Sequence, residues 1–152
     1  TDTIKLIVKG RPVPKSRPRL GMRGRTAYIY TPEKTKEYQQ LVGWVARKKC
    51  RKPLEGPVAV FMRLYSMGRY DLDNVAKSIL DGMNKICYED DEQVALLLVL
   101  KEKVDEERDE RAEVEVMPLS ACAWVPESVF RGRKVRRVSN SNQAKEQGNG
   151  GV

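Results

Sequence analysis

Two groups of acidic residues are the first candidates for chemistry in this sequence. Asp71 and Asp73 are one residue apart, so in an extended segment both carboxylates point to the same side. Carboxylate oxygens are the ligands that Mg²⁺ and Mn²⁺ prefer. The chain has no histidine, which leaves carboxylates, lysines and metal-bound water for proton transfer. The second group follows in a turn and consists of Glu89, Asp90, Asp91 and Glu92.

Each acidic group also has an ordinary structural explanation. An acid at the start of a helix often caps it or favours its dipole, so the pair Asp71 and Asp73 alone is a weak signal. Acidic runs in turns are usually solvated surface. Two acidic clusters that flank one helix are harder to explain in this way, because like charges brought together cost energy unless a cation neutralises them. The combination favours a divalent metal site.

Lys77 adds a cation to the same region. It follows Asp73 by four residues, which places the two side chains one turn apart on one face of a helix. Its ammonium could support Asp73 or contact a phosphate. The alternative is an ordinary ion pair between helical residues, which contributes a few tenths of a kcal/mol.

The net charge of +8 is distributed unevenly along the chain. Residues 1–53 hold 15 Lys and Arg against 3 Asp and Glu, whereas residues 54–117 hold 8 against 16. This pattern favours a surface that attracts polyanions beside a pocket that attracts cations. Tyr28 and Tyr30 could stack on unpaired bases or simply pack beside a helix start. The cations expected to contact nucleic acid are Lys15, Arg17, Arg19, Arg23, Arg25 and Arg69.

The elements that position these groups follow from apolar periodicity and turn residues. Residues 94–100 are apolar on both faces, which predicts a central strand, and we expect it to form a hairpin with 112–117. Residues 15–30 lack apolar periodicity and are expected to be an exposed, mobile loop. The remaining strands are expected at 4–8 and 58–67, and helices at 31–48 and from Asp73 to about Asn84.

These elements predict an α+β fold in two layers, with a mixed four-stranded sheet and two main helices. The composition changes after Leu119, and residues 139–151 have too little apolar surface to offset the entropy of ordering them. We therefore expect a basic, largely disordered C-terminal tail. The longest apolar run, 94–100, is too short to span a membrane. Three unpaired cysteines and no signal pattern predict a cytoplasmic protein with reduced, space-filling thiols.

The combined motifs resemble the RusA family of Holliday junction resolvases. The resemblance covers roughly residues 3–117 and is specific because several motifs occur in order. They are GRPVPKSRPR at 10–19, YTPE at 30–33, DLDNxxK at 71–77, ILD at 79–81 and EDDxQV at 89–94. On this basis we divide the chain into a RusA-like nuclease domain at 1–119 and a tail at 120–152.

The resemblance implies a structure-selective endodeoxyribonuclease that resolves four-way junctions by paired symmetric nicks in DNA recombination and repair. Asp71, Asp73 and Asp91 would bind Mg²⁺, with Mn²⁺ as a substitute, and Asp90 would be an accessory ligand. Lys77 would be the cation required in the same site. Family members are homodimers, so a homodimer acting on branched DNA is implied.

Two alternatives to this reading stay open. The chain could be a noncatalytic DNA-binding protein, or a nuclease that prefers flaps or single strands. The sequence also leaves open whether Asp91 completes the site of its own chain or that of a partner subunit.

Overall fold

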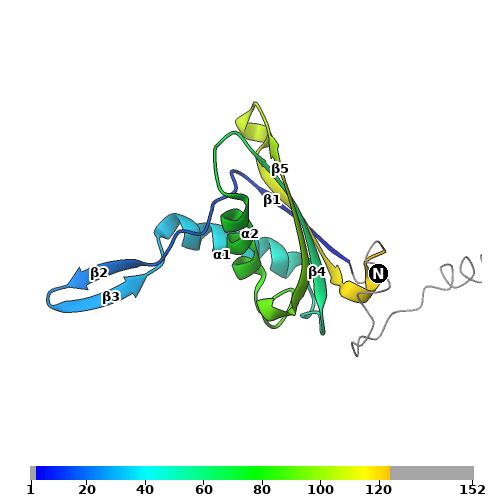
Figure 1. The fold of residues 1–152 in the computed structure, drawn as a ribbon, viewed down its shortest axis with the longest axis horizontal. Helices are drawn as coiled ribbons and strands as arrows, with labels where there is room; N and C mark the ends of the chain where they lie inside the picture. The colour runs from blue at the N-terminus through cyan, green and yellow to red at the C-terminus, as the bar shows by residue number, and fades with distance from the viewer. Residues whose placement is uncertain (1–2, 124–152) are drawn as a thin grey trace, which may run out of the picture.

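The computed structural model describes residues 3–123, which form a four-stranded sheet, two helices and a separate hairpin (Figure 1). The sheet order is β1-β6-β4-β5, with β6 antiparallel to both β1 and β4, and β4 parallel to β5. The predicted α+β fold with a mixed four-stranded sheet is confirmed. The strands are β1 (Ile4–Lys9), β4 (Val58–Ser66), β5 (Val94–Lys103) and β6 (Arg111–Pro118).

The two helices, α1 (Glu33–Lys49) and α2 (Leu72–Met83), lie on the same side of the sheet (Figure 1). Alternate residues of the strands point toward them, because successive side chains of a strand face opposite sides. The predicted helices at 31–48 and from Asp73 to about Asn84 are confirmed to within two residues at each end. The core between the layers includes Leu6, Val8, Val60, Met62, Val114, Val42, Ala46, Val75, Ile79 and Met83.

Two glycines allow the helices to cross closely. A Cβ atom on Gly82 of α2 would lie 2.7 Å from the Val42 Cβ and 2.9 Å from the carbonyl oxygen of Gln39. A Cβ atom on Gly43 of α1 would lie 3.3 Å from the carbonyl oxygen of Gly82. Neither backbone can move away without separating the helices. This contact therefore fixes the distance between α1 and α2.

We predict that Gly82→Ala destabilises the protein. Alanine gains about 1 kcal/mol over glycine in a helix interior, but overpacking against a backbone carbonyl costs about 1–3 kcal/mol. The matched control is Gly68→Ala, where the nearest atoms to a new Cβ are 3.7 Å away. Urea denaturation should give a lower midpoint for Gly82→Ala alone. An equal or higher midpoint would show that the helices are not closely packed there.

The predicted place of β5 in the sheet is wrong. β5 is an edge strand, and its only neighbour in the sheet is β4 rather than β6. The chain leaves β4, passes through α2 and returns parallel to β4, and β6 then enters between β1 and β4. The apolar pattern on both faces of β5 is not explained by burial among residues 3–123, where Leu97, Leu98 and Leu100 remain 41–43% exposed.

Residues 19–30 form a hairpin rather than an irregular loop. Its strands, β2 (Arg19–Arg23) and β3 (Thr26–Tyr30), pair antiparallel around the turn residues Gly24 and Arg25. Gly24 has φ +60°, the conformation that a two-residue hairpin turn requires at its first central position. The hairpin projects away from the body of the protein (Figure 1). We call residues 19–30 the arm.

A buried carboxylate joins the segment after β1 to the sheet. Glu110 accepts hydrogen bonds from the Arg11 guanidinium, at 2.8 Å, and from the Ser66 hydroxyl and the Met67 amide. The hydrogen bond from Arg11 lowers the pKa of Glu110, so its carboxylate stays charged at neutral pH. The start of β6, the end of β4 and the chain after β1 are thereby held together.

The cysteines are free thiols, and Cys87 and Cys122 are buried, as expected for space-filling residues. The Sγ atoms of Cys50 and Cys87 lie 2.8 Å apart. Within residues 3–123, no helix is long and apolar enough to cross a membrane. Most of the predicted tail, from residue 124 onward, lies outside the described residues.

Candidate active site

Asp71 and Asp73 lie at the exposed start of α2. Asp71 occupies the N-cap position, where its backbone carbonyl accepts from Val75, but its carboxylate makes no capping hydrogen bond. That carboxylate accepts only a long, 3.3 Å hydrogen bond from the side-chain amide of Asn74. Capping therefore does not account for the Asp71 side chain, whereas Asp73 lies in the first turn, where an acid favours the helix dipole.

Asp73 is exposed in the first turn of α2. Within residues 3–123, its carboxylate forms no hydrogen bond or ion pair with another protein group. In the same part of the chain, no three Asp, Glu, Cys or His side chains are arranged so that they could hold a metal ion. Asp71, Asp73 and Asp91 are thus not gathered into one cluster, although Asp71 and Asp73 share the start of α2.

Lys77 joins α2 to the second acidic group. Its ammonium lies 3.0 Å from a carboxylate oxygen of Asp91 and 3.6 Å from one of Asp81. The hydrogen bond with Asp91 raises the pKa of Lys77 and lowers the pKa of Asp91, so both are charged at neutral pH. The helical ion pair of Lys77 is therefore with Asp81 and not with Asp73. Asp91 thus returns to the middle of α2.

Asp81 is a member of the site that sequence reasoning did not single out. Its carboxylate accepts a 2.6 Å hydrogen bond from the Lys15 ammonium and a 3.4 Å hydrogen bond from the Gln39 side chain. The backbone amide of Lys15 also donates to the carbonyl of Asn74 on α2. Lys15 is thus fastened to α2 at two points. Asp81 follows Lys77 by four residues, and this spacing is the signal in the sequence that could have identified it.

The turn that carries Asp91 is held by Gln93. The Gln93 side-chain oxygen accepts from the backbone amides of Glu89 and Asp90, at 2.8 and 3.1 Å. Its side-chain amide donates to the carbonyls of Leu54 and Gly56, at 2.8 and 2.9 Å. Gln93 therefore ties this turn to the loop before β4 and fixes the place of Asp91.

The carboxylate of Asp90 has a structural contact in the same turn. It accepts a 3.0 Å hydrogen bond from the amide of Glu92 and caps the short 3-10 helix Asp91–Gln93. This cap uses one of its two oxygens. The role of Asp90 as an accessory metal ligand stays a prediction.

We predict that Gln93→Ala displaces Asp91. The change removes four hydrogen bonds and leaves two carbonyls less well satisfied, which costs about 1–3 kcal/mol. The denaturation midpoint and nicking of DNA should both fall. Glu92→Gln is the matched control, because Glu92 is an exposed neighbour in the same turn. A Gln93→Ala protein that keeps both properties would refute the fixing role of this side chain.

The predicted DNA-binding cations fall into two sets. Lys15 is paired with Asp81, so its charge is offset within the protein. The other five are exposed and lie on the approach to the arm, on the arm or beside Asp71, and they are Arg17, Arg19, Arg23, Arg25 and Arg69.

Comparison with known proteins bears directly on this arrangement. Residues 9–117 match the family described as Endodeoxyribonuclease RusA, and this stretch contains α2, the Asp91 turn and the arm. The chain belongs to the RusA family. It is also 30% identical over 140 residues to "Uncharacterized protein YqaN" of Bacillus subtilis (strain 168), an alignment that covers 76% of this chain and 95% of that protein.

Membership in the RusA family identifies the chain as an endodeoxyribonuclease of the Holliday junction resolvase type. Of the motif residues from which the resemblance was inferred, Ile79 and Leu80 are buried in the core, whereas the acids and the lysine lie on α2 or in the adjoining turn. The donors available there are carboxylate oxygens, which suit Mg²⁺ and Mn²⁺. The chemistry of the side chains fits a divalent cation, although within residues 3–123 no three of them are gathered around one point.

Proposed function

We propose that the chain is a Mg²⁺-dependent endodeoxyribonuclease that resolves four-way DNA junctions by paired symmetric nicks. The proposal rests on Asp71 and Asp73 at the start of α2, whose carboxylates form no ion pair within residues 3–123. They lie on the same helix as Lys77, which holds Asp91, in a chain of the RusA family. The catalytic residues in this proposal are Asp71, Asp73, Lys77 and Asp91.

Asp71, Asp73 and Asp91 would hold the metal, with Asp90 as an accessory ligand and Mn²⁺ as a substitute ion. A divalent ion supplies a water with a lowered pKa and offsets charge on the leaving oxygen. Lys77 is protonated at neutral pH, and the hydrogen bond with Asp91 raises its pKa further. Its ammonium can stabilise the phosphate oxygens as charge develops. Asp81, the second carboxylate paired with Lys77, helps to position its ammonium.

The exposed arginines around the site would bind the DNA backbone. Arg17, Arg19, Arg23 and Arg25 form a positive approach to α2, and Arg69 lies two residues before Asp71. Contacts with phosphates give affinity that falls with salt and carry little sequence information. Lys15 instead holds the chain before the arm against α2, so it positions the arginines.

Cleavage of a labelled four-way junction is the test of this function. In Mg²⁺ the protein should introduce symmetric nicks in two opposed strands and leave a matched linear duplex intact. Asp73→Asn should reduce the rate by about 100-fold or more, the scale for losing one group that stabilises transition-state charge. Asp105→Asn makes the same change at an exposed acid outside the site and should retain full activity.

The same experiment separates the alternatives. Binding without metal-dependent nicking by the natural protein would establish a noncatalytic DNA-binding protein. Cleavage of flaps or single strands in preference to the junction would establish a nuclease of different selectivity. Full activity of Asp73→Asn would remove the proposed metal site.

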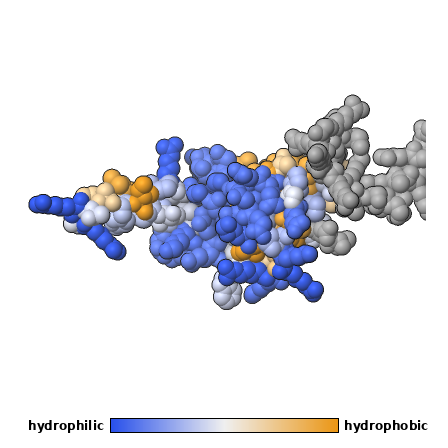
Figure 2. Space-filling model, turned by 90° about the horizontal axis from the view of Figure 1, so that it is seen from below, coloured by the Kyte–Doolittle hydropathy of each residue, from blue (hydrophilic) through white to orange (hydrophobic). Residues whose placement is uncertain are grey.

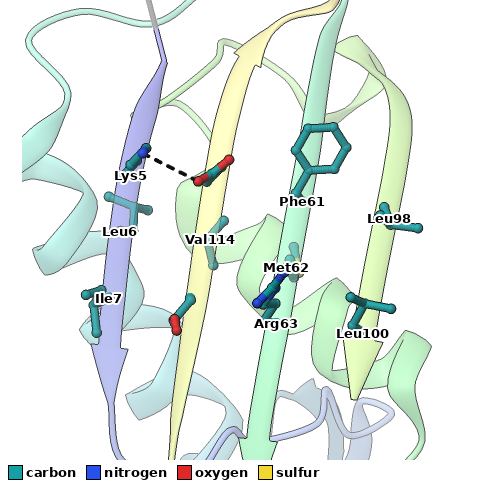
Figure 3. A pocket seen from close by; sticks show the side chains of 11 residues that line it. Lys5, Leu6, Ile7, Phe61, Met62, Arg63, Leu98, Leu100 and Val114 are labelled. Atoms are coloured by element: carbon teal, nitrogen blue, oxygen red, sulfur yellow. Dashed lines mark ion pairs between the residues drawn. The ribbon is translucent and has the colours of Figure 1, made fainter. Parts of the chain in front are cut away.

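The open face of the sheet supports a homodimer. On the side away from the helices, a shallow cavity of about 550 Å³ is lined by apolar and charged residues (Figure 3). Lys5 pairs with Glu115 at 3.8 Å on this face. The face carries both signs of charge beside apolar surface, so a second copy turned by a two-fold rotation offers complementary groups. The lining includes Lys5, Ile7, Phe61, Arg63, Leu98, Leu100, Glu113 and Glu115.

We predict that Leu98→Lys converts a dimer to a monomer. Leu98 is 41% exposed in the described chain, and a dimer that covers it would have to bury an unpaired charge. Leu41→Lys on α1 is the matched control, because Leu41 is 44% exposed but belongs to the other layer. Sedimentation velocity should show a monomer for Leu98→Lys only. A natural protein that sediments as a monomer would exclude this dimer.

A further inference from the structure

The register of the arm gives its two faces different chemistry. Arg19 pairs with Tyr30, Gly21 with Tyr28 and Arg23 with Thr26, so these residues share one face. The alternate pairs, Leu20 with Ile29 and Met22 with Ala27, form the other face. One face of the arm is therefore aromatic and basic, and the other is apolar.

Gly21 allows Tyr28 to lie flat across the aromatic face. A Cβ atom on Gly21 would lie 2.6 Å from the Cζ atom of the Tyr28 ring. The ring centroids of Tyr28 and Tyr30 are 5.7 Å apart, and the Arg23 guanidinium lies 5.7 Å from the Tyr28 centroid. The two rings thus form an aromatic surface in which they are tilted by 39° to each other, and the guanidinium lies over the Tyr28 ring.

This aromatic surface is open to solvent. Tyr28 and Tyr30 are each 41% exposed, so neither ring is buried against the start of α1. No acidic residue occurs anywhere from Arg11 to Pro32. The charge of this segment therefore suits a polyanion, and its rings suit a planar, apolar group on that polyanion.

The base of the arm is anchored beside the candidate active site. The Lys15 amide donates to the Asn74 carbonyl on α2, and the Ser16 amide donates to the Thr35 hydroxyl at the start of α1. The segment that leads into the arm is therefore held against the helix that carries Asp73. The arm itself is a two-stranded hairpin, which gains stability from a bound ligand.

We propose that Tyr28 and Tyr30 form a stacking surface for unpaired DNA bases, with Arg19 and Arg23 binding the adjacent phosphates. The proposal rests on the proposed function and extends it, because it explains how the protein distinguishes a branched or distorted substrate from a continuous duplex. Bases stack on aromatic rings whatever their sequence, while paired bases within a duplex present no free face.

The apolar face of the arm provides an internal control. Leu20, Met22 and Ile29 are 61–75% exposed and carry no hydrogen-bonding groups. Figure 2 shows apolar surface on the arm, at the left of the view, beside hydrophilic side chains at its end. Changes on this face alter the same hairpin without touching the two rings.

Binding measured in EDTA tests the proposal without any cleavage. The probes are a fully paired duplex and the same duplex with a central bulge of unpaired thymines. Replacing both rings, Tyr28→Leu with Tyr30→Leu, should weaken binding to the bulged DNA by about tenfold, the scale of losing a stacked base. Binding to the paired duplex should change by less than about twofold, since its phosphate contacts remain. Tyr28→Phe with Tyr30→Phe keeps both rings and should bind as the natural protein does.

Leu20→Thr with Ile29→Thr should leave both affinities unchanged. Gly21→Ala should weaken only the binding to bulged DNA, because the new Cβ displaces the Tyr28 ring. The proposal is overturned if the leucine variant loses affinity equally for both DNAs, or if it loses none. A selective loss in the threonine variant would assign recognition to the apolar face instead.

Junction nicking in Mg²⁺, measured on the same proteins, keeps this proposal separate from the proposed function. Absence of nicking by the natural protein would refute the proposed function. The stacking surface would still be tested by the affinities for bulged and paired DNA in EDTA. Normal nicking with unselective binding would refute the stacking surface alone.

Discussion

The candidate site depends on the alternation of charge around one helix. Lys15, Asp81, Lys77 and Asp91 form a row of three ion pairs along which the sign of the charge alternates. These ion pairs hold the turn after α2 against the middle of that helix. They also fasten the segment before the arm to the side of α2. Without them, the acids near α2 would repel one another across solvent. Asp71 and Asp73 lie outside the row of pairs, so their negative charge remains available to a cation.

The parts of this protein that could be predicted from sequence are those in which local pattern and burial agree. The 3.6-residue period of Val75, Ile79 and Met83 marks α2 because the same side chains fill the core. The motif from Asp71 to Lys77 was readable for a related reason. Its acids and its lysine are exposed, while the apolar residues between them pack in or against the core. The family match at 9–117 agrees with that reading.

The errors arose where a pattern reflects something other than burial within one chain. Leu98 and Leu100 have the apolar character of a central strand, yet β5 is at the edge, and the described residues leave both side chains more than 40% exposed. The arm was mistaken for a loop because an exposed hairpin has no core to impose a period, and only Gly24 in its turn marks it. Contacts between distant residues, such as those of Gln93 with Leu54 and Gly56, leave no local pattern at all.

The position of β6 has a consequence for how the chain acquires its structure during synthesis. β6 is the last strand of the sheet to be made, yet it lies between β1 and β4. When β4, α2 and β5 have emerged, they can associate as a parallel unit, but β1 has no strand to pair with. It must wait until residues 111–118 leave the ribosome and complete two ladders at once. Pairing the first strand with the last closes a long loop, which makes this step slow relative to helix formation. The nascent chain therefore carries an unpaired β1 until nearly the whole nuclease domain has been made.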